Sequence, residues 1–253
     1  MSTAEGLLTT LAEWRPGFCV EEARDLASSM TASAARGFCG SRVGSLGERP
    51  RELLVLFENE SCPRSRLVRE ALSILDLDAA MRPCPRGELA HRAELRSRGG
   101  IEPIPFLLDP NSGARRSGVT GIVRYLFDTY GDGRVPRALM SSTAIGRSRL
   151  ASAIRDHAGG RKVTARRPEL ALELYGYEPE PRSRLVREQL SALGLPWISR
   201  TRARGSPRRR ERSCPLGLPW LHDPNTERSL CGWGAGGTDL ICAYLNATYA
   251  RSP

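Results

Sequence analysis

The sequence is poor in lysine, histidine and aromatic residues, and it has no long hydrophobic run. Lys162 is its one lysine, so 37 of the 38 basic residues are arginines (38 − 1 = 37). No apolar run approaches the roughly 18 residues that a membrane-spanning helix needs. The first residues lack the basic start and apolar core of a secretory signal. We therefore expect an intracellular protein without a transmembrane segment.

The spacings typical of metal sites and disulfide frameworks are also missing. The seven cysteines include no Cys-x-x-Cys pair, and no histidine stands at zinc-ligand spacing from a cysteine. An odd number of scattered cysteines without an export signal favours free thiols. We predict no metal site, and we interpret four of the cysteines as packing residues: Cys84, Cys214, Cys231 and Cys242.

The remaining composition is that of a globular protein with an excess of positive charge. Hydrophobic residues make up 40% of the 253 residues and charged residues 26%, which excludes a disordered or fibrous chain. The formal net charge is +10. Guanidinium groups bind carboxylates and phosphates bidentately, so this excess favours an acidic partner.

An internal repeat determines the predicted organisation. The eight residues Pro63–Glu70 recur without change as Pro181–Glu188, at an offset of 118 (181 − 63 = 118). Downstream, Asp109-Pro110-Asn111 corresponds to Asp223-Pro224-Asn225. The chain is therefore predicted to duplicate a unit of about 80 residues, which indicates two domains rather than a solenoid.

Each unit has the same predicted order of elements: strand, helix, strand, polar segment, strand, strand, helix. Apolar runs predict the strands, and apolar residues at helical spacing predict the helices. The predicted strands include 53–57, 79–82, 104–108, 170–175 and 197–200, and the closing helices span 122–130 and 239–249. This order predicts a mixed α/β fold with two four-stranded sheets and flanking helices.

The predicted domain boundaries follow from the repeat. We expect an N-terminal extension over 1–50 with a helix at Val20–Ala35. A first domain over 51–133, a linker with a helix over 134–168 and a second domain over 169–250 complete the chain.

The motifs of the first unit resemble those of tandem glutathione S-transferase N-terminal domain proteins of plants, algae and bacteria. The resemblance rests on the run from Leu56 to Ser65, on Arg82–Gly87, and on the linker opening Gly131–Pro136. It covers roughly residues 51–250 and implies two thioredoxin-like domains. For plant and algal members it implies a plastid location, and otherwise the cytoplasm is expected.

The resemblance also implies a thiol site in the first unit. Cys62 precedes the first helix, where backbone N–H groups and the helix dipole stabilise a thiolate. Ile104 and Pro105 correspond to the backbone site for glutathione, with Pro105 in the cis form; we expect Pro219 to be cis as well. Ser65 stands at the position of a resolving cysteine, so only a mixed disulfide is expected.

Other positions depart from the family pattern. Gly118-Val119 replaces the Glu-Ser pair that holds the γ-glutamyl end of glutathione, and Glu180 stands where the second unit would carry its cysteine. No all-helical transferase domain follows either unit, so we expect no residues to build an electrophile pocket. Ordinary transferase chemistry is therefore not predicted, and the expected cofactor is none, or glutathione bound weakly.

An arginine-rich segment is the other candidate site. Between Ser199 and Ser213 seven arginines face one glutamate; they are Arg200, Arg202, Arg204, Arg208, Arg209, Arg210 and Arg212. One interpretation is a solvated loop, and the other is a contact for an acidic protein surface. No aromatic residues interleave with these arginines, so nucleic acid is not the expected partner.

Two functional hypotheses follow. The first is a catalytically degenerate tandem thioredoxin-fold protein that acts as an interaction or accessory subunit of a larger assembly. The second is a glutathione-dependent monothiol oxidoreductase that uses Cys62 alone.

Overall fold

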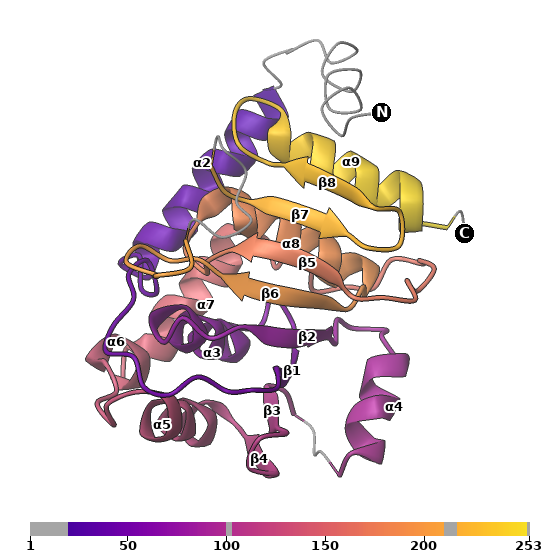
Figure 1. Ribbon diagram of the computed structural model, residues 1–253. Coiled ribbons are helices and arrows are strands. Elements are labelled where there is room, and N and C mark those ends of the chain that lie inside the picture. Colours follow the sequence, from indigo (N-terminus) through magenta and orange to yellow (C-terminus); the bar gives the residue numbers. More distant parts are fainter. Residues whose placement is uncertain (1–19, 100–102, 210–216, 252–253) are drawn as a thin grey trace.

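The computed structural model describes residues 20–99, 103–209 and 217–251. Its strands form one eight-stranded mixed sheet in the order β4-β3-β1-β2-β6-β5-β7-β8 (Figure 1). The strands are β1 (Leu54–Glu58), β2 (Ala79–Pro83), β3 (Phe106–Asp109), β4 (Ala114–Ser117), β5 (Leu172–Gly176), β6 (Trp197–Thr201), β7 (Trp220–Asp223) and β8 (Arg228–Cys231). The described helices are α2 (Val20–Ala35), α3 (Pro63–Ile74), α4 (Ala90–Ser97), α5 (Val119–Tyr130), α6 (Arg137–Met140), α7 (Ala144–Ile154), α8 (Pro181–Leu193) and α9 (Gly237–Tyr249).

The two halves of the sheet have the same order and directions. In the first half β1 pairs parallel with β2 and antiparallel with β3, which pairs antiparallel with β4. In the second half β5 pairs in the same way with β6 and β7, and β7 with β8. The peptide bonds before Pro105 and Pro219 are both cis, as predicted.

The expectation of two separate sheets is wrong, because β2 and β6 pair antiparallel and join the halves. Ala80 lies opposite Ile198, and these residues are 118 positions apart (198 − 80 = 118), the offset of the repeat. A residue that faces its own counterpart across an antiparallel pair marks an approximate two-fold axis. Strands β2 and β6, each of which would be an edge strand in its half alone, are thereby paired, and β4 and β8 form the edges of the joined sheet.

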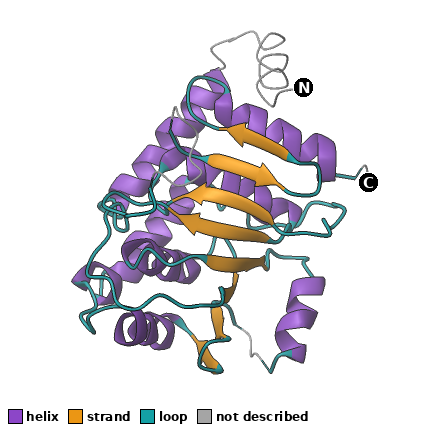
Figure 2. Ribbon diagram, viewed as in Figure 1, coloured by secondary structure: helices purple, strands orange, loops and turns teal. Residues whose placement is uncertain are grey.

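One face of the sheet holds the main hydrophobic core. Residues of α3, α5, α8 and α9 pack there with the inward side chains of β1, β2, β5 and β6. Figure 2 shows the helices and the sheet strands in separate colours. A smaller core on the opposite face contains Phe57 and Phe106 and is closed by Leu95 of α4. In the second half, the described residues between β6 and β7 contain no helix that corresponds to α4.

Helices α2 and α7 cross between the halves. Helix α2 lies before the first half yet contacts α8, and α7 lies before the second half yet contacts α3. Ser29 Oγ donates to the carbonyl of Pro181 (2.9 Å), and Ser148 Oγ donates to the carbonyl of Pro63 (2.8 Å). The segment predicted as an extension therefore carries a helix whose contacts duplicate those of the linker helix.

The repeated octapeptides meet in a buried group of charged side chains. We call it the central charge cluster: Glu58, Glu60, Arg66, Arg69, Glu178, Arg184 and Arg187, each no more than 4% exposed. Arg69 Nε donates to Glu178 Oε2 (2.8 Å), and its counterpart Arg187 Nε donates to Glu60 Oε2 (3.1 Å). Arg69 and Arg187 thus each pair with a carboxylate of the other half.

Candidate functional site

Cys62 immediately precedes α3, whose first helical residue is Pro63. Proline suits this place because its missing N–H would have no helical partner there. Cys62 is a free, half-buried thiol, and its side chain makes no capping hydrogen bond. Ser65, at the resolving position, is buried, and its Oγ accepts from the Asn59 N–H (3.3 Å). The thiol therefore has no cysteine partner at the second position of a dithiol site.

The second half uses the corresponding position for structure. The Glu180 side chain caps α8: its Oε1 accepts from Arg182 N–H (3.1 Å) and its Oε2 from Ser183 N–H (2.5 Å). Only 7% of Glu180 is exposed. A carboxylate at a helix N-cap satisfies free N–H groups and stabilises the helix by about 1 kcal/mol. The residue at the position that corresponds to Cys62 therefore caps α8.

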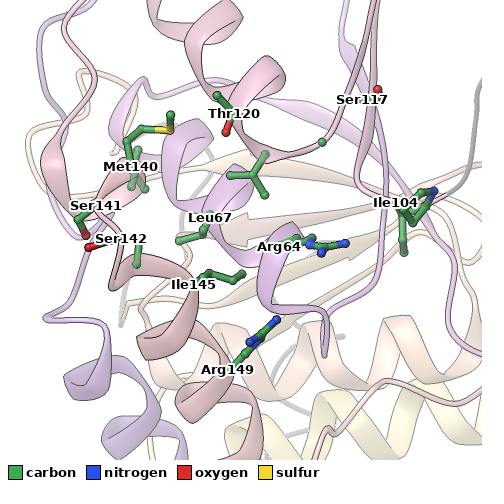
Figure 3. Close-up of a pocket in the computed structure, with 15 residues that line it drawn as sticks. Arg64, Leu67, Ile104, Ser117, Thr120, Met140, Ser141, Ser142, Ile145 and Arg149 are labelled. Carbon is green, nitrogen blue, oxygen red and sulfur yellow. The ribbon is translucent and has the colours of Figure 1, made fainter.

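A cavity of about 650 Å³ lies beside the start of α3 in the first half (Figure 3). It is lined by Arg64 and Leu67 of α3, by Ile104 before the cis-proline, and by the Gly118-Val119 pair at the start of α5. The structure thus brings Ile104 and the start of α5 together as the resemblance implied. Cys62 does not line this cavity.

The residues at the γ-glutamyl position do not fit glutathione. Gly118 has no side chain, and the Val119 side chain can neither accept from an ammonium nor donate to a carboxylate. The cis-Pro105 loop is present, and Ile104 is half-buried. The cis-proline loop of the resembled family is therefore present, while Gly118 and Val119 offer no polar side chain beside it.

Helices α6 and α7 form the opposite wall of the cavity. Leu139 and Met140 belong to α6, and Ile145 and Arg149 belong to α7. The linker thus supplies a cavity wall that was not predicted, while the expectation about an electrophile pocket stays a prediction. The wall was missed because the linker folds back over the first half, which the repeat pattern did not indicate.

Three of the seven arginines in the arginine-rich segment pair with a carboxylate of the first half. Arg208 Nη1 lies 2.6 Å from Asp78 Oδ2, and Arg200 Nη1 lies 3.3 Å from the same oxygen. Arg202 Nη1 is 3.4 Å from Asp78 Oδ1. These three arginines belong to the second half and Asp78 to the first, so they hold the halves together. The interpretation as a solvated loop is wrong for them.

The other arginines of the segment differ. Arg204 is exposed, and Arg209 lies half-buried with its guanidinium 5.8 Å from the centre of the Tyr177 ring. Neither has a carboxylate partner among the described residues. Arg210 and Arg212 lie outside the described residues. Tyr175 of β5 also lies beside this segment, with its ring centre 5.2 Å from the Arg202 guanidinium, a contact that the local sequence did not predict.

The other described cysteines differ from Cys62 in their surroundings. Cys39, Cys84 and Cys242 are free. Burial raises the pKa of the Cys39 thiol well above its usual value, and burial raises the pKa of Cys242 to about 12. Cys231 is disulfide-bonded, so its interpretation as a free packing thiol is wrong. Cys214 lies outside the described residues.

The described residues contain no group of three or more histidine, cysteine or acidic side chains placed to hold a metal ion. None of the described helices has the length and apolar character to cross a membrane.

Residues 56–134 match the family model of the glutathione S-transferase N-terminal domain. The match begins in β1 and ends before α6, so it contains Cys62, the cis-Pro105 loop and α5. These residues therefore form a thioredoxin-like domain of the glutathione S-transferase N-terminal type. No curated protein and no solved structure matches the chain.

Proposed function

We propose that the chain is a catalytically degenerate tandem thioredoxin-fold protein that acts as an interaction or accessory subunit. The observation that carries the proposal is Glu180, which caps α8 at the position where the second unit would need a thiol. In the first unit, the cavity beside the cis-proline lacks Cys62 in its lining. On this proposal, neither unit has both a thiol and a complete set of glutathione-binding residues.

The shared sheet and the central charge cluster support this proposal. The strands of the two units form one sheet, and the helices that carry the repeated octapeptides are buried where the units meet. Each half thereby buries part of its surface against the other, as a subunit built to hold a fixed shape would.

A turnover assay tests the proposal. The full chain would be supplied with reduced glutathione and a small mixed disulfide, and the release of oxidised glutathione would be followed. We expect no turnover that depends on Cys62, so wild type and Cys62→Ser should give the same background rate. A rate that Cys62→Ser abolishes would overturn the proposal.

A glutathione-dependent monothiol oxidoreductase is the second candidate, because Cys62 is a free thiol at the start of a twelve-residue helix. In that reaction the Cys62 thiolate attacks one sulfur of a disulfide and the other sulfur leaves as a thiolate. A glutathione thiolate then attacks the mixed disulfide and releases Cys62. Ser65 excludes an internal disulfide in this scheme.

Alkylation of the cysteines gives a prediction that both candidates share. After a short pulse of iodoacetamide at neutral pH, Cys62 should carry more label than Cys39, Cys84 or Cys242. Cys84 is fully buried, and burial raises the thiol pKa values of Cys39 and Cys242, so their thiolate fractions are small. Peptide mass spectrometry measures the order. Equal labelling of all four would contradict the placement of Cys62 at an accessible helix start.

We also propose that the arginine-rich segment contacts an acidic protein surface. Among the described residues, Arg204 and Arg209 would make this contact. The other three, Arg200, Arg202 and Arg208, already have internal carboxylate partners. The double variant Arg204→Gln/Arg209→Gln should recover less partner from native extract at low salt, and high salt should abolish recovery by the wild type. Recovery of the same proteins by the wild type and by the double variant at both salt concentrations would refute the contact.

A further inference from the structure

The cavity between α3, α5, α6 and α7 combines an apolar wall with two guanidinium groups. The apolar side chains are Leu67, Val119, Leu139, Met140 and Ile145. Arg64 enters the cavity from α3 and Arg149 from α7 (Figure 3). The cavity volume of about 650 Å³ is in the range of sites that hold small organic molecules.

The two arginines are available for a ligand. In the part of the chain that the structure describes, neither Arg64 nor Arg149 forms an ion pair, whereas twelve other arginines pair with carboxylates: Arg36, Arg49, Arg66, Arg69, Arg82, Arg98, Arg155, Arg167, Arg187, Arg200, Arg202 and Arg208. The described residues lining the cavity include no acidic side chain. Two like charges without a counter-charge favour a bound anion.

The second half does not repeat this arrangement. The counterpart of Arg64 is Arg182 (182 − 64 = 118), whose guanidinium lies 5.2 Å from the centre of the Trp233 ring. Helix α2 corresponds to α7 at an offset of 119, from Ser29 and Ser148, so the counterpart of Arg149 is Met30. A pair of guanidinium groups beside an apolar wall therefore belongs to the first half, although the backbone is duplicated.

We propose that this cavity binds an organic anion with an apolar body, its charged head between Arg64 and Arg149 and its body against Met140 and Ile145. The head is a carboxylate or sulfonate, which guanidinium groups bind with charge-assisted hydrogen bonds. The site uses residues of α6 and α7, which lie outside the matched family domain. Its binding does not require the Cys62 thiol.

Two fluorescent probes with nearly the same apolar body test the proposal on the full chain. The probe 8-anilinonaphthalene-1-sulfonate carries a sulfonate, and N-phenyl-1-naphthylamine does not. We expect the sulfonate probe to bind more tightly, and its Kd to rise by about tenfold or more in Arg64→Gln/Arg149→Gln. The Kd of the neutral probe should change less than about twofold, since its contacts are apolar.

Matched variants separate the contributions. Arg182→Gln removes the counterpart guanidinium and should leave the Kd of both probes unchanged. Met140→Gln removes part of the apolar wall and should weaken both probes. Far-UV circular dichroism and the melting temperature confirm that each variant is folded. An unchanged Kd for the sulfonate probe in the double arginine variant, or an equal loss for both probes, overturns the proposal.

Discussion

Glu178→Gln should lower the free energy of unfolding by about 3–5 kcal/mol, because it leaves buried arginines without their shared carboxylate. Glu178 is 3% exposed and lies between arginines of both halves. Its oxygens are 2.8 Å from Arg69 Nε, 3.1 Å from Arg187 Nη2 and 3.7 Å from Arg66 Nη1. The change reduces the carboxylates of the central charge cluster from three to two, against four guanidinium groups. Urea denaturation of the full chain measures the loss.

The control for this variant is Glu169→Gln, which removes the same charge from an exposed position. It should change the free energy of unfolding by no more than about 0.5 kcal/mol. Because the cluster joins the two halves, Glu178→Gln should destabilise both in one transition. A loss below about 1 kcal/mol in Glu178→Gln would show that the cluster does not hold the halves together.

The free energy of unfolding of the wild type should fall as pH rises from about 5 to 8, and Glu58→Gln should remove this fall. Burial, with Glu60 and Glu178 nearby, raises the pKa of Glu58 to about 7 against the attraction of Arg69. The unfolded pKa is about 4.3. Because its pKa is raised, Glu58 holds its proton more tightly in the folded state than in the unfolded state. The contribution of Glu58 to the free energy of unfolding is therefore complete below the unfolded pKa and is lost as pH rises through 7.

The expected difference between wild type and Glu58→Gln across this window is on the order of 3 kcal/mol, at about 1.4 kcal/mol for each pKa unit. The measurement is the free energy of unfolding from urea titrations at pH 5, 6, 7 and 8. The wild type should lose stability with rising pH relative to the variant. Parallel curves for the two proteins would contradict the raised pKa. The pKa of Glu178 is instead lowered to about 2, so its contribution is lost as pH falls from about 4.3 towards 2.

Much of the local structure followed from the sequence. The helix predicted at Val20–Ala35 has those bounds in the structure, and the second strands begin at Ala79 and Trp197 as predicted. These elements depend on short-range patterns: apolar spacing, Pro at a helix start and β-branched or aromatic runs. The two Asp-Pro-Asn turns were also predicted from the sequence. In the structure, Asp109 and Asp223 of these turns each accept hydrogen bonds from two tyrosines of the following helix.

The arrangement of the halves did not follow from the local patterns. Helical spacing placed Arg66 and Arg69 away from the apolar face of α3, yet both are buried because the other face of α3 meets the second half. One signal was present: the run at 32–36, ASAAR, recurs at 151–155 as ASAIR. Arg36 and Arg155, which end these runs, bind Glu70 and Glu188 with two hydrogen bonds each. The sequence similarity between the two halves thus extends upstream of the units of about 80 residues that were predicted.

The candidate site was predicted in part. Cys62, Ile104 and Pro105 lie at the start of α3 and in the cis-proline loop, as the resemblance implied. The cavity wall from α6 and α7 was missed because the contacts of a linker depend on tertiary packing. The internal pairing of Arg200, Arg202 and Arg208 was missed for the same reason, since Asp78 is more than 120 positions away in the sequence.

Isothermal titration calorimetry of reduced glutathione with the full chain tests the central claim most directly. The account predicts weak binding or none, with the same result for wild type and Cys62→Ser, because Gly118 and Val119 offer no polar side chain for the γ-glutamyl end. Micromolar binding by the wild type that is lost in Cys62→Ser would contradict it and would favour the monothiol oxidoreductase.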